Sequence, residues 1–163
     1  MEDRTILRLK GIKLIGVDVD GTLTDGKLYF FENSPEPAKA FNVKDGMAFH
    51  IARSAGIKIV IISGLASRAS EQRARLLGLE DAFFGVRDKR EVMKKIMEKY
   101  GVKRGEAVFL GDDIQDIPAM EEAGVGVAVS DAVEEVKKRA DIVLKSRGGE
   151  GALRELVELI LRK

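Results

Sequence analysis

The sequence has no cysteine and no apolar run of the roughly 18 residues that a membrane-spanning helix needs. The absence of cysteine excludes a disulfide framework, a thiolate zinc site and a cysteine nucleophile, and it fits a reducing compartment. Residues 1–13 are too charged, and too poor in consecutive apolar residues, for a signal peptide. We therefore expect a cytoplasmic protein with no membrane partner.

The chain also lacks an excess of charge of either sign. Its 28 lysine and arginine residues face 27 acidic residues, so its net charge is +1. Such a balance offers no broad basic surface for nucleic acid, and we expect no nucleic-acid partner. A length of 163 residues suits one well-buried domain, which we assign to residues 1–163.

Short apolar runs recur along the chain and alternate with amphipathic segments. The runs lie at residues 13–19, 57–62, 81–85, 106–111, 124–129 and 141–144. The amphipathic segments lie at residues 45–56, 66–78, 89–101, 117–124 and 151–163. This alternation predicts an α/β fold with a doubly wound, mostly parallel sheet and helices on both faces. Ligands of such folds bind at the carboxyl ends of the strands.

One segment, residues 27–41, breaks the alternation. It has two short apolar pieces around a polar turn that contains proline, which predicts a protruding β-hairpin. The segment is too short to form a second domain.

Two acidic residues, Asp18 and Asp20, end the first predicted strand. Side chains two positions apart on a strand point the same way, so both carboxylates can face one pocket. Two like charges so close favour a cation between them, and Mg²⁺ prefers oxygen ligands. A bare D-x-D is more often a simple turn, but the longer string "DVDGT" after an apolar strand favours a site.

Polar residues follow three other predicted strands. Ser63 and Gly64 can cradle a phosphate, although Ser-Gly is also a common turn. Lys89 can supply a positive charge to a phosphoryl oxygen, although a lone lysine is usually a solvated one. The string "GDDIQD" brings three acids together, of which one can cap a helix; they are Asp112, Asp113 and Asp116.

The order of these four sites resembles the motifs of the haloacid dehalogenase-like phosphohydrolases. The resemblance implies that Asp18 is the nucleophile that attacks phosphorus and that Asp20 is the general acid and base. It further implies that Asp18, the backbone carbonyl of Asp20, and Asp112 hold magnesium. Ser63, Gly64 and Lys89 would then bind the phosphoryl group, with Asp113 and Asp116 as supporting acids.

The gap from Asp20 to Ser63 has room for a hairpin and one helix, and the gap from Lys89 to Asp112 only for a helix and a strand. Neither gap can hold a cap domain. A site without a cap stays open to water unless a large substrate or another subunit covers it. The predicted hairpin at residues 27–41 lies next to the first aspartates. It is our candidate for contacts between subunits.

A narrower resemblance covers nearly the whole chain from residue 12. The strings "DVDGTLTDG", "KAFNVKDGMAFHIARSAGIKIVIISG" and "RGGEGALRE" are similar to those of the capless 3-deoxy-D-manno-octulosonate 8-phosphate phosphatases. That family implies a homotetramer joined through its hairpins, with a neighbouring subunit over each site. It also implies substrate contacts from Arg73 and from the segment Asn42, Val43, Lys44, Asp45 and Gly46.

Two positions depart from the pattern of this family. Leu65 and His50 stand where the family often has arginine, so two cationic donors that can recognise a sugar carboxylate are missing. We expect His50, the only histidine, to fill a helix face. The departures keep open a related nonulosonate 9-phosphate phosphatase, or another sugar phosphate phosphatase, as an alternative.

Two further alternatives come from other classes of protein. Related domains occur as non-catalytic modules fused to sugar-nucleotide synthetases, but the four motifs are intact here. Phospho-accepting receiver domains also use an aspartate, a hydroxyl residue, a lysine and an acidic pair. In receivers the acidic pair comes first, and no acid follows two residues after the nucleophile, so the motif order disfavours them.

Overall fold

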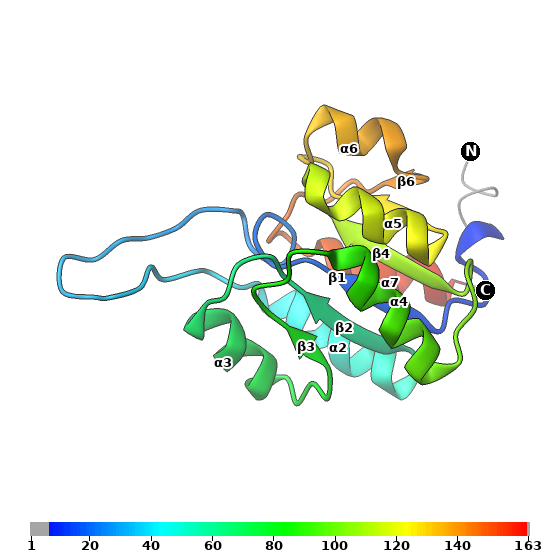
Figure 1. Cartoon of the computed structure of the whole chain (residues 1–163), viewed down its shortest axis with the longest axis horizontal. Helices are drawn as coiled ribbons and strands as arrows, with labels where there is room; N and C mark the ends of the chain where they lie inside the picture. The colour runs from blue at the N-terminus through cyan, green and yellow to red at the C-terminus, as the bar shows by residue number, and fades with distance from the viewer. Residues whose placement is uncertain (1–6, 163) are drawn as a thin grey trace.

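A computed structural model describes residues 7–162 of the chain. Its centre is a six-stranded parallel sheet in the order β3-β2-β1-β4-β5-β6 (Figure 1). The strands are β1 (Leu14–Val17), β2 (Lys58–Ile62), β3 (Ala82–Phe83), β4 (Ala107–Gly111), β5 (Gly126–Ala128) and β6 (Ile142–Val143). Each lies within one of the six predicted apolar runs, so the doubly wound parallel sheet is confirmed. The first six residues of the segment judged unlike a signal peptide, and Lys163 of the last predicted helix, lie outside the described residues.

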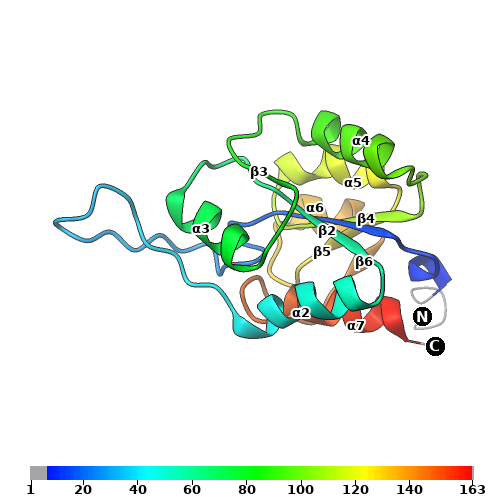
Figure 2. The same cartoon turned by 90° about the horizontal axis from the view of Figure 1, so that it is seen from below.

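Helices cover both faces of the sheet. The helical elements are α2 (Val43–Ser54), α3 (Arg68–Leu76), α4 (Lys89–Tyr100), the 3-10 turn η1 (Ile114–Asp116), α5 (Ile117–Ala123), α6 (Glu134–Arg139) and α7 (Ala152–Leu161). Figure 2 shows α2 and α7 on one face and α4 and α5 on the other. The five predicted helices are confirmed, while α6 was missed because its six residues bury only Val136. None of the helices within residues 7–162 has the length and apolar character of a membrane span.

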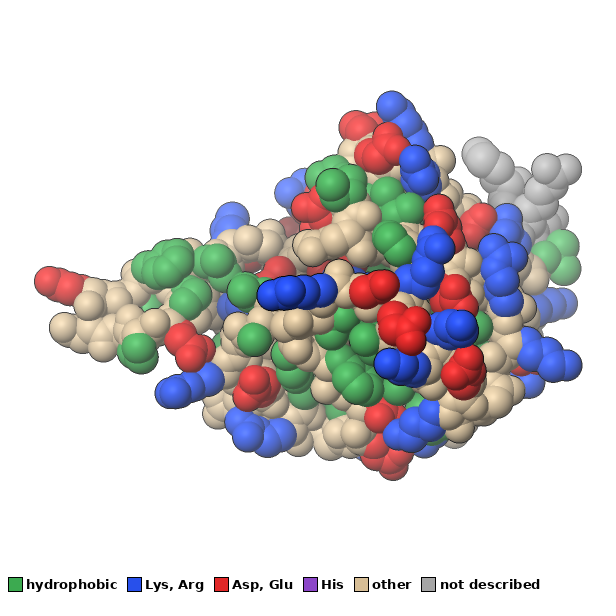
Figure 3. Space-filling view, in the orientation of Figure 1, with side chains coloured by type: hydrophobic (Ala, Val, Ile, Leu, Met, Phe, Trp, Pro, Cys, Tyr) green, Lys and Arg blue, Asp and Glu red, His purple; other side chains and the backbone are tan. Residues whose placement is uncertain are grey.

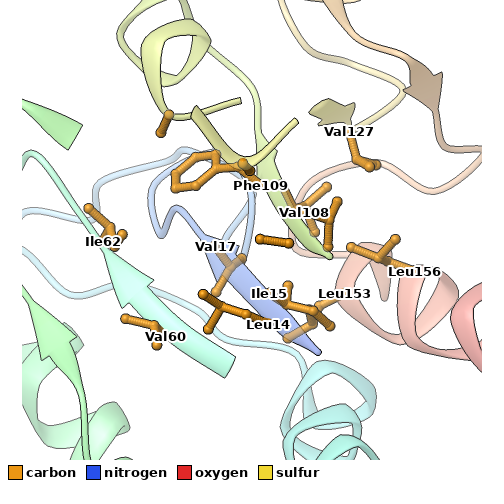
Figure 4. Packing of buried hydrophobic residues seen from close by; sticks show 14 of the residues in the cluster. Leu14, Ile15, Val17, Val60, Ile62, Val108, Phe109, Val127, Leu153 and Leu156 are labelled. Atoms are coloured by element: carbon orange, nitrogen blue, oxygen red, sulfur yellow. The ribbon is translucent and has the colours of Figure 1, made fainter. Parts of the chain in front are cut away.

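Strand β1 forms the middle of the core and is buried along its whole length. Its neighbours β2 and β4, together with α7, surround it with aliphatic side chains (Figure 4). Gly16 is required on the α4 side, because a Cβ there would lie 2.7 Å from the Phe109 ring and 2.9 Å from Met93 Sδ. The core therefore fixes the position at which β1 ends and the predicted site begins.

The register of the three central strands places their carboxyl ends together. Val17 of β1 aligns with Ile61 of β2 on one side and with Leu110 of β4 on the other. The residues that follow these strands therefore meet at one edge of the sheet, as the sequence predicted.

Residues 27–41, the protruding segment, extend away from the body at this same edge (Figure 1). Its two arms run antiparallel and meet in one bridge, in which Tyr29 and Ala38 exchange backbone hydrogen bonds of 3.1 and 2.8 Å. The predicted course of a hairpin is thus present, but its two regular strands are not. Pro35 and Pro37 cannot donate to a ladder, and a two-stranded pair without a supporting sheet is marginally stable.

Candidate active site

The loop after β1 holds Asp18 in the middle of the sheet edge. The Asp18 N–H donates to the Leu110 carbonyl at 3.1 Å, so β1 stays joined to β4 up to the carboxylate, which is almost fully buried. The chain then turns at Gly21, whose φ of +88° favours glycine. A Cβ on Gly21 would lie 2.1 Å from Asp112 Oδ2, so the backbone approaches the acidic loop of β4 directly.

Lys89 connects two of the predicted acids. As the first residue of α4 it places its Nζ 2.6 Å from Asp18 Oδ1 and 2.6 Å from Asp116 Oδ1. All three side chains are buried. A buried lysine is costly unless it is paired, and here two carboxylates compensate it. The lysine is therefore part of the cluster and not a solvated side chain.

Asp116 organises the acidic loop after β4. Its Oδ2 accepts the backbone N–H groups of Asp112 and Asp113 at 2.9 and 3.2 Å, while its Oδ1 accepts from Lys89. Asp113 caps the 3-10 turn through the Ile114 N–H at 2.7 Å. The expectation that one of the three acids is a cap is thus confirmed for Asp113. Asp112, which accepts from the Thr22 hydroxyl at 3.3 Å, turns toward the loop of β1.

The electrostatics of this cluster are those of a site with too much negative charge. Burial, and then the charge of Asp116, raises the pKa of Asp18 to about 6, although Lys89 acts in the opposite direction. Burial and the charges of Asp18 and Asp116 raise the pKa of Asp112 to about 8. Burial also acts to lower the pKa of Lys89, but the two carboxylates outweigh it and raise that pKa. One ammonium does not balance three acids.

The donor set fits a hard divalent cation. Carboxylate oxygens of Asp18, Asp112 and Asp116 lie within 4.8 Å of one another, the spacing of ligands around a single ion. Oxygen-only ligands suit magnesium better than zinc, which favours histidine and cysteine. Both oxygens of Asp116 already accept hydrogen bonds, so Asp18 and Asp112 have the oxygens that remain open to a cation.

Ser63 and Gly64 border the cluster on the β2 side. Ser63 is buried at the end of β2, and its backbone N–H and carbonyl continue the pairing with the β3 side through Phe83 and Val86. Its hydroxyl donates to the Leu65 carbonyl at 3.3 Å. Gly64 faces the acidic loop, because a Cβ there would lie 3.2 Å from Gln115 Oε1. The loops after β2 and β4 therefore meet across the end of β1.

Two of the residues expected to contact substrate, Asn42 and Asp45, also make hydrogen bonds within the fold. Asn42 caps α2 through the Lys44 N–H at 2.8 Å and donates to the Gly149 carbonyl at 3.1 Å. Asp45 is buried and accepts the N–H groups of Gly151 and Arg154 at the start of α7. Burial raises the pKa of Asp45, and these hydrogen bonds oppose the rise.

The other members of that set divide between packed and exposed positions. Arg73 packs between α3 and α2, against Gly46 and 5.8 Å from the centre of the Phe41 ring. Val43 and Lys44 are exposed at the start of α2. Leu65 and His50, which stand at the positions of the missing arginines, are exposed as well.

One functional candidate was missed by the sequence reasoning. Lys39, on the returning arm of the protruding segment, places its Nζ 2.7 Å from Asp20 Oδ1, and its side chain is fully buried. Nothing in a hairpin pattern predicts a buried lysine, because alternation sorts residues only into two faces. The acid Asp20 is thus held from outside the four motifs.

Comparison with known proteins agrees with this geometry. Residues 85–156 match the model of the haloacid dehalogenase-like hydrolases. The 3-deoxy-D-manno-octulosonate 8-phosphate phosphatase of Escherichia coli strain K12 is 37% identical over 156 residues, which are 96% of this chain and 82% of that protein. This chain belongs to the 3-deoxy-D-manno-octulosonate 8-phosphate phosphatase family.

Solved structures of the family have the same fold. The phosphatase from Moraxella catarrhalis, in complex with a magnesium ion, a phosphate ion and a KDO molecule, superposes with a TM-score of 0.92 at 34% identity, covering 98% of this chain and 91% of that one. The cobalt-bound phosphatase from Haemophilus influenzae gives a TM-score of 0.89 at 37% identity, covering 94% and 90%. Family membership therefore rests on sequence and fold together.

Proposed function

We propose that this protein is a magnesium-dependent phosphatase that hydrolyses 3-deoxy-D-manno-octulosonate 8-phosphate to the free sugar acid and phosphate. The observation that carries the proposal is the buried cluster at the end of β1 and β4. Asp18 and Asp112 are brought together there, and Lys89 lies 2.6 Å from Asp18. A nucleophilic carboxylate, a cation site and a fixed positive charge are the parts that phosphoryl transfer requires.

In the proposed reaction, an oxygen of Asp18 forms a bond to phosphorus while the ester bond to the sugar oxygen breaks. Asp20 gives its proton to the departing alkoxide, which leaves as an alcohol. Asp20 then takes a proton from water, the water oxygen bonds to phosphorus, and the bond between phosphorus and Asp18 breaks. Phosphate is released, and both carboxylates return to their starting state.

The groups that would hold magnesium are the side chains of Asp18 and Asp112 and the backbone carbonyl of Asp20. Magnesium supplies positive charge that neutralises the phosphoryl oxygens. Lys89, Ser63 and Gly64 would bind the phosphoryl group from the α4 and β2 sides. Asp116 holds Lys89 and the N–H groups of the acidic loop in place, which makes it a supporting acid. Asp113 supports the same loop as a cap.

We further propose that the whole chain, residues 1–163, acts as one capless domain in a cytoplasmic homotetramer. The protruding segment supports the assembly, because it presents exposed apolar side chains that have little to pack against in one chain (Figure 3). These side chains are Leu28, Tyr29, Phe30 and Phe31. A neighbouring subunit would cover the open site and exclude water from it.

A nonulosonate 9-phosphate phosphatase is the alternative, because two positions depart from the pattern of the octulosonate enzymes. Leu65 is exposed beside Ser63 where a cationic donor to a sugar carboxylate is often found, and His50 is exposed on α2. Either acid sugar must therefore be recognised by other groups.

The test is release of phosphate from the two sugar phosphates side by side, with magnesium and with an excess of chelator. We expect faster turnover of the octulosonate phosphate, and loss of activity with the chelator and in Asp18→Asn. Faster turnover of the nonulosonate phosphate would establish the alternative. Equal and weak rates on both would overturn either specific assignment.

The same samples separate the other classes of protein. An unchanged oligomer with no measurable turnover in wild type or Asp18→Asn would indicate a non-catalytic module. A phosphorylated Asp18 that persists for minutes, detected by mass spectrometry, would indicate a receiver domain.

A further inference from the structure

Lys39 is buried against the carboxylate proposed as the general acid and base. Its Nζ lies 2.7 Å from Asp20 Oδ1, and its side chain has no exposed area. Among the described residues, Asp20 Oδ1 is buried without a hydrogen-bond partner, so the contact is an ion pair and not an aligned hydrogen bond. Burying an ammonium costs several kcal/mol unless it is compensated. The Asp20 carboxylate supplies this compensation, so the two side chains depend on each other.

The fold fixes Lys39 from two directions. Its chain neighbour Ala38 is held by the bridge to Tyr29 at the base of the protruding segment. The Lys39 ammonium also lies 3.3 Å from the hydroxyl of Ser70, a buried residue in the first turn of α3. With its backbone and its terminal nitrogen both located, the side chain can in turn fix the carboxylate that it faces.

The contact distinguishes the two oxygens of Asp20. Oδ1 is buried against Lys39, whereas the Asp20 side chain as a whole keeps 27% of its area exposed. The exposed part therefore includes the side that faces away from Lys39. An oxygen turned toward an ammonium is unsuited to carry the proton that a general acid donates, which leaves this task to Oδ2.

We propose that Lys39 is a positioning residue that orients Asp20 so that one carboxylate oxygen is directed at the leaving group. This inference rests on the proposed function. It adds a residue from outside the four motifs and makes the base of the protruding segment part of the catalytic apparatus.

The experiment compares substrates that differ in their need for a general acid. The variants Lys39→Met and Lys39→Arg are assayed with magnesium on the alkyl sugar phosphate and on 4-nitrophenyl phosphate, whose leaving group departs without a proton. The measured quantity is kcat/KM, which covers the steps up to transfer of the phosphoryl group to Asp18. We expect Lys39→Met to lower kcat/KM for the sugar phosphate about 100-fold and to leave the aryl phosphate nearly unchanged. Lys39→Arg keeps the charge, and it should retain most of the kcat/KM for the sugar phosphate relative to that for the aryl phosphate.

Lys13→Met is the matched control, since Lys13 pairs with Glu106 at 2.7 Å on the surface. It removes a lysine and an ion pair at the amino ends of β1 and β4, the opposite ends of these strands from the site, and both substrates should react as in wild type. If Lys39→Met does not fold by circular dichroism, Lys39→Gln carries the same expectation.

An equal loss on both substrates would overturn the inference, because a merely structural role moves both values together. No loss on either substrate would overturn it as well. An increase in KM for the sugar phosphate alone, at unchanged kcat, would assign Lys39 to substrate binding instead. Failure of the wild-type protein on every phosphate ester would instead count against the proposed function.

Discussion

Gly148 packs directly against Gly21, because a Cβ added to Gly148 would lie 1.8 Å from the Gly21 carbonyl oxygen. The next residue, Gly149, donates its N–H to the Thr22 carbonyl at 2.9 Å. The loop before α7 therefore supports the turn that follows the proposed nucleophile. Asn42 and Asp45 hold this loop in turn, through the Gly149 carbonyl and the N–H groups of Gly151 and Arg154.

The first prediction concerns Gly148→Ala. The added methyl group collides with backbone, so we expect a loss of about 1–3 kcal/mol in the free energy of unfolding and a strong loss of phosphatase activity. Urea unfolding and phosphate release measure the two effects. Gly101→Ala is the control: its φ of +62° costs about 1 kcal/mol, but no atom lies within 4 Å of the new Cβ, and activity should remain. Full activity in Gly148→Ala would contradict the supporting role of this loop.

Asp116 and Asp113 should respond differently to the same replacement. Asp116→Asn leaves one oxygen to serve Lys89 and two backbone N–H groups, and it turns an amide NH2 toward a buried donor. We therefore expect a loss of about 1–3 kcal/mol in the free energy of unfolding, and loss of most activity. Asp113→Asn replaces one good cap residue with another, so we expect the free energy of unfolding to change by about 0.5 kcal/mol or less. Chemical denaturation of both variants at one pH checks the contrast. Similar losses in the two would show that the cap matters as much as the buried pair.

Magnesium binding should release protons at neutral pH. Without a cation, the Asp112 carboxyl has a pKa of about 8 and is mostly protonated at pH 7. A cation favours the ionised form, so binding releases a proton at pH 7 but not at pH 9.5, and the apparent affinity rises with pH in between. Titration calorimetry in two buffers of different ionisation enthalpy measures the number of protons. The same heat in both buffers at pH 7 would refute this prediction.

Glu155 should make stability depend on pH. Burial acts to raise its pKa, but hydrogen bonds from the backbone N–H groups of Lys145 and Ser146 outweigh it and lower the pKa below the usual 4.5. The carboxylate then stabilises the fold above pH 4.5, and this contribution is lost as pH falls toward the lower, folded-state pKa. We expect Glu155→Gln to lower the free energy of unfolding more at pH 7 than at pH 4. Urea titrations at both values test the difference, and Glu158→Gln, on the exposed face of α7, serves as control.

The protruding segment should control the oligomeric state. Phe30 and Phe31 are 78% and 63% exposed in the single chain. Replacing both with serine should reduce the mass measured by light scattering to that of a smaller assembly or a monomer. A wild-type protein that is already monomeric at micromolar concentration would rule out the proposed tetramer.

The parts of the fold that repeat along the chain were predictable from the sequence. Six short apolar runs give the parallel sheet, and the register of β1 with β4 then brings Asp18 and Asp112 together. What escaped prediction depends on contacts between distant segments. Asp45 contacts Gly151 across 106 residues, and Lys39 contacts Asp20. Neither contact leaves a periodic pattern in the sequence around its partners.

The function of a polar residue was harder to predict than its location. The family resemblance predicts substrate contacts for the segment from Asn42 to Gly46, and this stays a prediction. The structure adds that Asn42 caps α2 and that Asp45 accepts from the start of α7. Caps and ligand contacts use the same side chains, since both need a short oxygen acceptor. Asp113 and Asp116 show the same ambiguity between a structural role and a ligand role, only three residues apart.

Both edges of the sheet are short, because β3 and β6 have two residues each. Short edge strands expose little unpaired backbone, and this limits the addition of foreign strands that leads to aggregates. The protruding segment differs from these edge strands, since only one residue pair joins its two arms. A change that lengthens β6 is therefore expected to make the protein more prone to precipitate, even where the chemistry at Asp18 is untouched.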